Sequence, residues 1–80
     1  MLHIGKDATV PLKNIVLILD YKEAMINNDT NAFLKKLSDR AHTIYIEDYN
    51  VKSVIISRFL NKDFIYYSPL SPATLYKRSQ

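Results

Sequence analysis

The stretch IVLILD, at residues 15–20, is the segment that decides the fold. Its five consecutive apolar residues are mostly β-branched and too few for a helix, and such a run is typical of a strand buried on both faces. We therefore predict a central strand over residues 15–19, closed by Asp20 as a turn residue. This is also the longest apolar run in the chain, far short of the ~20 residues that span a bilayer.

Other short apolar segments lie on both sides of this run. Apart from it, we predict strands over residues 2–4, 9–10, 43–47, 54–56 and 64–67. The first two form a small hairpin around Gly5, and Pro11 ends it because proline cannot donate to a ladder. Residues 43–47 alternate as a half-buried strand does. Because neighbours on a strand face opposite ways, Tyr66 and Tyr67 cannot both be core, and one lies at the surface or at a subunit contact.

Two segments predict helices. The polar residues 27–30 supply side chains that cap free N–H groups, and Phe33, Leu34 and Leu37 then fall on one face of an amphipathic helix. The Ser71-Pro72 pair opens a short C-terminal helix, since serine caps well and proline suits the first helical position. Strands joined by tight turns predict an antiparallel sheet, so the chain is expected to be one α+β domain over residues 1–80.

Composition excludes several kinds of chemistry. The 80 residues are 48% hydrophobic and include no cysteine and one glycine, which removes disulfides, a thiolate nucleophile, cysteine zinc sites and a glycine-rich phosphate loop. His3 and His42 have no metal-ligand spacing, and the adjacent Glu47 and Asp48 point to opposite faces of a strand. We predict no enzyme, metal or cofactor. No signal-peptide pattern begins the chain, so we expect it in the cytoplasm.

A binding role has more support. The formal net charge is +3, and residues 49–80 carry five Lys/Arg against Asp63 alone, which suits a polyanion. Five of the six tyrosines also lie in the second half, where they could contact a protein or stack on unpaired bases. The cations expected to reach phosphate, each with solvated charge as its alternative, are Lys13, Lys52, Arg58, Lys62, Lys77 and Arg78.

The C-terminal segment, residues 65–78, contains a YYSPLS-xx-TL-xx-R pattern that resembles the RemA/RemB family of bacterial extracellular-matrix regulators, in particular its RemB-type members. Residues 2–5, 15–20, 33–36 and 52–55 are similar to that family in the same order. The resemblance implies a small cytoplasmic regulator that promotes transcription of biofilm-matrix genes. It also implies a LytTR-like fold and rings of identical subunits that present basic residues to double-stranded DNA.

The chain departs from this family at three positions. RemA-type members have arginines where this chain has Asn14, Tyr49 and Asn50, with Lys13 and Lys52 as the nearby cations. Neutral side chains contribute nothing to the phosphate contacts that dominate DNA affinity. We therefore predict weak, phosphate-directed DNA binding by a homo-oligomer, first through Lys13 and Lys52. The further predicted contacts are Arg58, Lys77 and Arg78. The alternative is an oligomeric protein-interaction or scaffold module that does not bind DNA.

Overall fold

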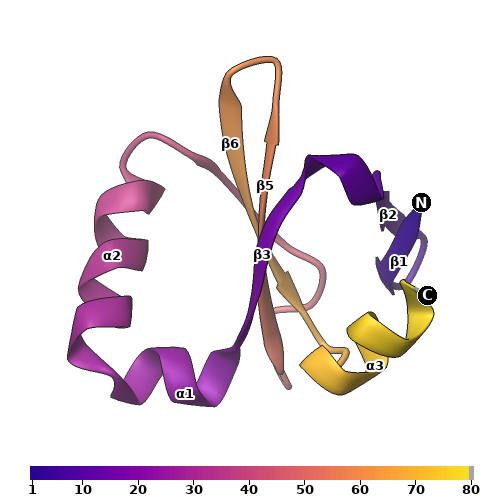
Figure 1. Cartoon of the computed structure of the whole chain (residues 1–80). Coiled ribbons are helices and arrows are strands. Elements are labelled where there is room, and N and C mark those ends of the chain that lie inside the picture. The colour runs from indigo at the N-terminus through magenta and orange to yellow at the C-terminus, as the bar shows by residue number, and fades with distance from the viewer. Residues whose placement is uncertain (80) are drawn as a thin grey trace.

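A four-stranded sheet organises the chain in the computed structural model, which describes residues 1–79 (Figure 1). Its strand order is β3-β5-β6-β4, with bounds β3 Ile15–Asp20, β5 Ser53–Phe59, β6 Lys62–Ser68 and β4 His42–Tyr45. The pairs β3–β5 and β5–β6 are antiparallel, but β4 runs parallel to β6. The α+β class is confirmed, and the predicted antiparallel sheet is confirmed in part, because the pairing of β4 with β6 makes the sheet mixed. Helices return the chain between β3 and β4, and such a crossover is what a parallel strand requires.

The predicted central strand is an edge strand. The centre of the sheet is formed by β5 and β6, where Val54, Ile55 and Ile65 are fully buried. On β3 the pairing with β5 is irregular between Ile15 and Leu17, and Val16 between them is 60% exposed. The predicted burial on both faces is also wrong, because none of the six residues of β3 is fully buried. An apolar run carries no information about which strands lie beside it.

The strand predicted over residues 43–47 also differs from its expected burial. It forms β4, His42–Tyr45, and all four of its residues are exposed rather than half-buried. Its position at the second edge of the sheet explains this, because only β6 pairs with it. Its rings lie against rings of β6: Tyr45 stacks on Tyr67 with centroids 4.5 Å apart, and His42 stacks on Phe64 at 5.2 Å.

Two helices cover one face of the sheet (Figure 1). The helix α2, Asn28–Ser38, was predicted, but α1, Tyr21–Ile26, was not. Asp20 caps α1 by accepting a hydrogen bond from the Glu23 N–H at 3.0 Å, and Asn27 caps α2 in the same way. Leu34 and Leu37 of α2 pack against Val54, Ile56 and Ile65, whereas Phe33, predicted on the same buried face, is 47% exposed.

The other face is covered by the N-terminal hairpin and the C-terminal helix (Figure 1). The hairpin of β1, Leu2–Gly5, and β2, Ala8–Val10, is confirmed, as is α3, Pro72–Arg78, which Ser71 caps. A 3₁₀ turn, η1 at Leu12–Asn14, leads from the hairpin into β3. Leu2, Ile4, Val10 and Leu75 form a second core around Ile55. Alternate residues of β5 thus serve two separate cores.

The buried Ser68 and the single glycine hold the N-terminal hairpin against the segment that follows β6. The Ser68 hydroxyl donates to the Ile4 carbonyl at 2.5 Å and accepts from the Leu70 N–H at 3.0 Å. Gly5 has φ +127°, and a Cβ there would lie 3.0 Å from Pro69 Cδ. These contacts hold the hairpin against the segment between β6 and α3. Of the helices within residues 1–79, none is long and apolar enough to cross a membrane.

Candidate functional site

The five predicted DNA-contacting cations are all exposed, but they do not form one cluster. Lys13 lies in η1, where β3 begins, and Lys52 lies just before β5, where β3 ends. Ile15 pairs with Ser57 and Asp20 pairs with Ser53, so five residues of strand, about 17 Å, separate the two ends. Lys13 and Lys52 would therefore contact phosphates at different places along a duplex.

The backbone of Lys52 is held firmly while its side chain remains exposed. Its N–H donates to the Ser68 carbonyl at 2.8 Å, and its carbonyl accepts from the Tyr21 N–H at 2.9 Å. These bonds join the start of β5 to the end of β6 and to α1. They fix the backbone from which the flexible, exposed Lys52 side chain extends.

Arg58 is less available than its sequence position suggested. Its Nε donates to Asp63 Oδ1 at 2.7 Å, and its Nη2 lies 3.4 Å from Oδ2. Arg40 approaches the same carboxylate, with Nε 3.8 Å from Oδ2. One carboxylate thus holds two guanidinium groups, which leaves the cluster of Arg40, Arg58 and Asp63 with a net charge of only +1. Arg58 and Asp63 are opposite each other on β5 and β6.

The two ionised forms in this cluster stabilise each other. The hydrogen bond from Arg58 is the largest effect and lowers the pKa of Asp63 below its usual value. Burial opposes it, and the charges of Arg58 and Arg40 add smaller effects in the lowering direction. The same hydrogen bond raises the pKa of Arg58. The sequence signal for the pair was available: Arg58 and Asp63 are the second residue pair out from a two-residue hairpin turn, so they face each other across the ladder.

Lys77 and Arg78 occupy the last turn of α3. A helix C-terminus carries a partial negative charge, so cations there also stabilise the helix itself. Both side chains are exposed and could reach a phosphate as well. This position separates them from Lys13 and Arg58, which lie toward the β5–β6 hairpin.

The three positions at which the family resemblance led us to expect arginines are also far apart in the fold. Asn14 ends η1, whereas Tyr49 and Asn50 lie in the loop between β4 and β5. Tyr49 is 70% exposed, and Asn50 has φ +57°, a conformation that asparagine tolerates better than most residues. The structure therefore places these neutral side chains near opposite ends of the sheet, as it does Lys13 and Lys52.

Two adjacent tyrosines of β6 serve different faces. Tyr66 packs with the core under the hairpin, and Tyr67 packs with the core under α1 and α2, so neither is freely exposed. Tyr67 stacks on Tyr45 and meets Tyr21 edge-on, with centroids 6.0 Å apart. Burial raises the pKa of Tyr67, and the neighbouring Tyr45 and Tyr21 raise it further. The sequence analysis did not single out His42, Phe59 and Phe64, although these are the aromatic residues that the structure brings together near the surface.

The part of the chain that the structure describes contains no group of three or more His, Asp or Glu side chains arranged to hold a metal. The chain is thus a small α+β domain that presents exposed cations and aromatic rings. Residues 1–78 match the RemA-like family, described as "Extracellular matrix regulatory protein A-like". The chain is also 37% identical to "Extracellular matrix regulatory protein B" of Bacillus subtilis (strain 168), over 99% of this chain and 89% of that protein.

The chain therefore belongs to the RemA-like family of extracellular-matrix regulatory proteins, and the resemblance read from its motifs is confirmed. No solved structure gives a significant match to it.

Proposed function

We propose that this chain, as a single domain, is a DNA-binding transcriptional regulator of extracellular-matrix genes that acts in the cytoplasm as a homo-oligomer and not as an enzyme. The family and the name of the Bacillus subtilis relative support the regulatory role. The observation that carries DNA binding is the free exposure of Lys13 and Lys52 at the two ends of β3. A LytTR-like fold is part of the proposal and rests on the family resemblance.

Exposed apolar groups and open sheet edges support the oligomer. The edge strand β4 contains His42, Thr43, Ile44 and Tyr45, with no lysine, proline or bulge to protect it from pairing. Natural edge strands of monomers are usually protected by such features. A closed ring of subunits would cover this edge and repeat Lys13 and Lys52 around its circumference.

The test is the salt dependence of duplex binding. The logarithm of the affinity for a promoter fragment falls with the logarithm of salt concentration, with a slope of about −0.9 for each phosphate contacted. We expect Lys13→Gln and Lys52→Gln each to weaken binding and to reduce the magnitude of the slope by about 1. Fluorescence anisotropy of a labelled duplex at several salt concentrations measures both quantities.

Lys35→Gln is the matched control. It removes the same charge from an exposed position of α2, on the opposite face from the hairpin, so its slope should stay at the wild-type value. An affinity that does not change between low and moderate salt would refute the phosphate contacts. Equal losses in all three variants would show a general charge effect rather than a site at Lys13 and Lys52.

A protein-interaction or scaffold module is the second candidate, favoured by a specific observation. The Arg40–Asp63–Arg58 cluster lines one part of a hollow of about 170 Å³, and the apolar side chains of Val16, Phe33 and Leu37 are among those that line the rest. Arg58 is engaged by Asp63, and Asn14, Tyr49 and Asn50 bring no charge. A chain that forms defined oligomers by light scattering but binds no duplex at low salt would favour this function.

A further inference from the structure

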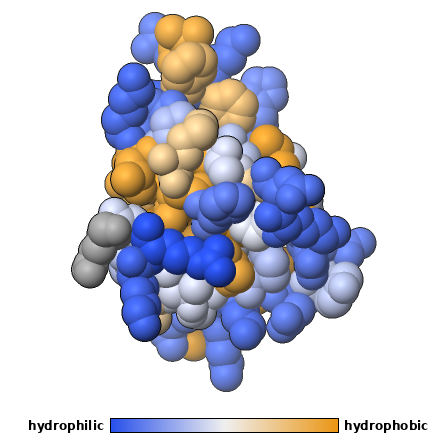
Figure 2. All heavy atoms as spheres, turned by 90° about the vertical axis from the view of Figure 1, so that its right-hand side faces the viewer, coloured by the Kyte–Doolittle hydropathy of each residue, from blue (hydrophilic) through white to orange (hydrophobic). Residues whose placement is uncertain are grey.

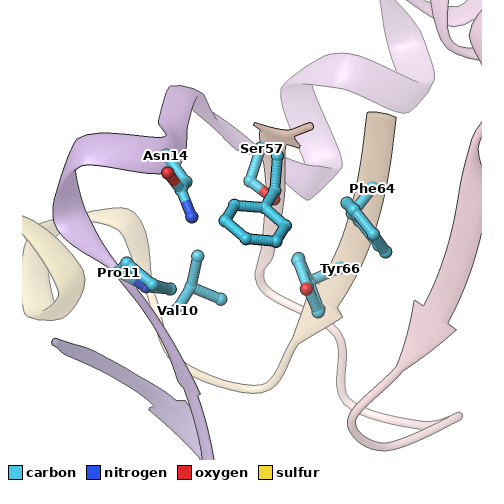
Figure 3. A pocket seen from close by; sticks show the side chains of 7 residues that line it. Val10, Pro11, Asn14, Ser57, Phe64 and Tyr66 are labelled. Atoms are coloured by element: carbon cyan, nitrogen blue, oxygen red, sulfur yellow. The ribbon is translucent and has the colours of Figure 1, made fainter. Parts of the chain in front are cut away.

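A second hollow, of about 240 Å³, lies on the sheet face that the N-terminal hairpin covers, between η1 and the upper parts of β5 and β6 (Figure 3). Figure 2 faces this side of the molecule and shows hydrophobic atoms gathered in its upper half, at and below the β5–β6 hairpin tip. None of the cations predicted to contact DNA lines this hollow. The lining is therefore distinct from the proposed phosphate contacts, although one of them, Lys13, is the chain neighbour of the lining residue Asn14.

A short side chain among large ones creates the hollow. Ser57 forms its floor, is 2% exposed and pairs with Phe64 across the β5–β6 ladder. Phe64 and Tyr66 are alternate residues of β6, so both rings stand on the same face beside Ser57. Phe59, at the end of β5, adds a third ring to the lining. Because serine fills so little of the space between these rings, the surface is recessed there.

The rings are held in a nearly parallel row. The planes of Phe64 and Tyr66 differ by 17°, with centroids 6.2 Å apart. His42 on β4 pairs with Phe64 in register and stacks on its ring, 5.2 Å away with planes 25° apart. His42 thus supports Phe64 from the β4 side, and Phe64 is among the residues that line the hollow. A planar ligand would find an aligned stacking surface there.

The polar lining matches the edge of a planar heterocycle. The side-chain amide of Asn14 points into the hollow, opposite the rings (Figure 3). An amide offers a donor and an acceptor side by side, the pattern with which asparagine binds the edge of a nucleobase. A purely apolar occupant would leave that amide without a partner, which is unfavourable in a desolvated site.

The size of the hollow and the charges near it further restrict the chemical class of its ligand. The hollow is smaller than the ~300–1,000 Å³ of pockets that enclose drug-sized ligands, so it accommodates one ring system while the rest of the ligand stays in solvent. Lys13 directly precedes Asn14, and Lys62 pairs with Phe59 across the ladder; both side chains are exposed. A phosphate attached to the bound ring system would emerge beside cations.

We propose that this hollow binds an unpaired nucleobase, stacked on Phe64 and Tyr66 and hydrogen-bonded at its edge by Asn14. The base belongs to a free nucleotide or to a single strand, since both present the same ring, edge and phosphate. A paired base in an intact duplex cannot enter, because both of its faces are stacked. This site goes beyond the proposed duplex binding and does not depend on it.

Calorimetric titration with AMP and with an eight-residue oligo(dA) tests the proposal on the full chain. We expect binding of at least one probe, and the comparison of their affinities identifies the source of the base. Phe64→Leu keeps an apolar group of similar size but removes the ring, and should weaken binding about 5- to 150-fold. Asn14→Ala removes the amide and should weaken it about 2- to 10-fold.

Phe33→Leu is the matched control, because Phe33 is an exposed ring on α2 under the opposite face, and it should leave the affinity unchanged. Circular dichroism establishes that each variant is folded; if Phe64→Leu unfolds, Asn14→Ala alone decides. No heat of binding with either probe, or equal losses in the control, overturns the proposal. So does loss of self-association in Phe64→Leu, which would mean that a second copy fills the hollow. Duplex affinity, measured separately, reports on the proposed function alone.

Discussion

Replacing Gly5 by alanine is the sharpest test of how the hairpin docks on the sheet. Gly5 has φ +127°, a backbone conformation that is open to glycine and strained for other residues. Holding alanine there costs about 1–3 kcal/mol in backbone strain. The new Cβ would also lie 3.0 Å from Pro69 Cδ and 3.1 Å from Ile46 Cγ2.

That crowding adds to the backbone strain. The proline ring cannot rotate away, so the hairpin or the segment after β6 must shift, and overpacking of this kind costs about 1–3 kcal/mol more. The combined loss of about 2–6 kcal/mol is a large share of the ~4–12 kcal/mol expected for a chain of this length. At the lower bound, Tm falls by about 8–16 °C, since each kcal/mol corresponds to ~4–8 °C in a small domain.

Thermal unfolding followed by circular dichroism measures the change in Tm. His3→Ala is the control, because His3 is an exposed residue of the same strand, and its Tm should stay close to that of the wild type. A Gly5→Ala protein with a Tm within 2 °C of the wild type would refute the reasoning that the hairpin needs a glycine at this approach.

Four further predictions concern the second core, the β5–β6 turn and Asp63. Leu75→Ala removes a fully buried side chain of α3 from the second core and should lower the free energy of unfolding by about 2–5 kcal/mol in urea titrations, whereas the neighbouring, exposed Tyr76→Ala should have little effect. Leu60→Asn should raise Tm by a few degrees, because Leu60 is 77% exposed at φ +52° in the β5–β6 turn, a conformation that asparagine tolerates; a lower Tm would contradict this. Asp63→Asn frees Arg58 and Arg40, so the proposed duplex binding should tighten and its salt slope steepen; an unchanged slope would mean that neither arginine reaches phosphate. Arg58 lowers the pKa of Asp63 in the folded state, so the stabilising effect of this carboxylate depends on pH. The effect is fully present above the unfolded pKa of about 3.9 and is lost as pH falls through the folded pKa. The Tm difference between wild type and Asp63→Asn should therefore be present at pH 7 and shrink in strong acid.

Local patterns predicted the elements well where the signal is itself local. The N-terminal hairpin, the helix after Asn27 and the helix opened by Ser71 all follow from turn and cap residues that act within three or four positions. The helix α1 was missed although its cap, Asp20, was noticed. Six residues are too few for a periodic signal, and the helix is stabilised by Ala24 in the first core.

The arrangement of the strands could not be predicted in the same way. Residues 15–19 and residues 54–56 are both apolar runs, yet the first lies at an edge and the second at the centre. The difference depends on which strands pair, and pairing joins residues far apart in the chain. The parallel strand β4 likewise depends on where α2 returns the chain.

The candidate site could likewise be predicted from the sequence only in part. Charge counts together with the family resemblance singled out Lys13, Lys52, Arg58, Lys77 and Arg78 as predicted phosphate contacts. Their separation, and the engagement of Arg58 by Asp63, required the ladder of β5 and β6. The hollow at Ser57 gave no signal in the sequence, since it is formed by residues from four elements.

By itself, the sequence determined the family, the α+β class, the caps of the helices and the absence of cysteine chemistry, because each of these follows from residue identity or from neighbours along the chain. Only the tertiary structure decided which apolar strand is central, which cations are free and where rings and an amide face one another. Those properties depend on contacts between distant segments, and such contacts leave no local pattern for a sequence to display.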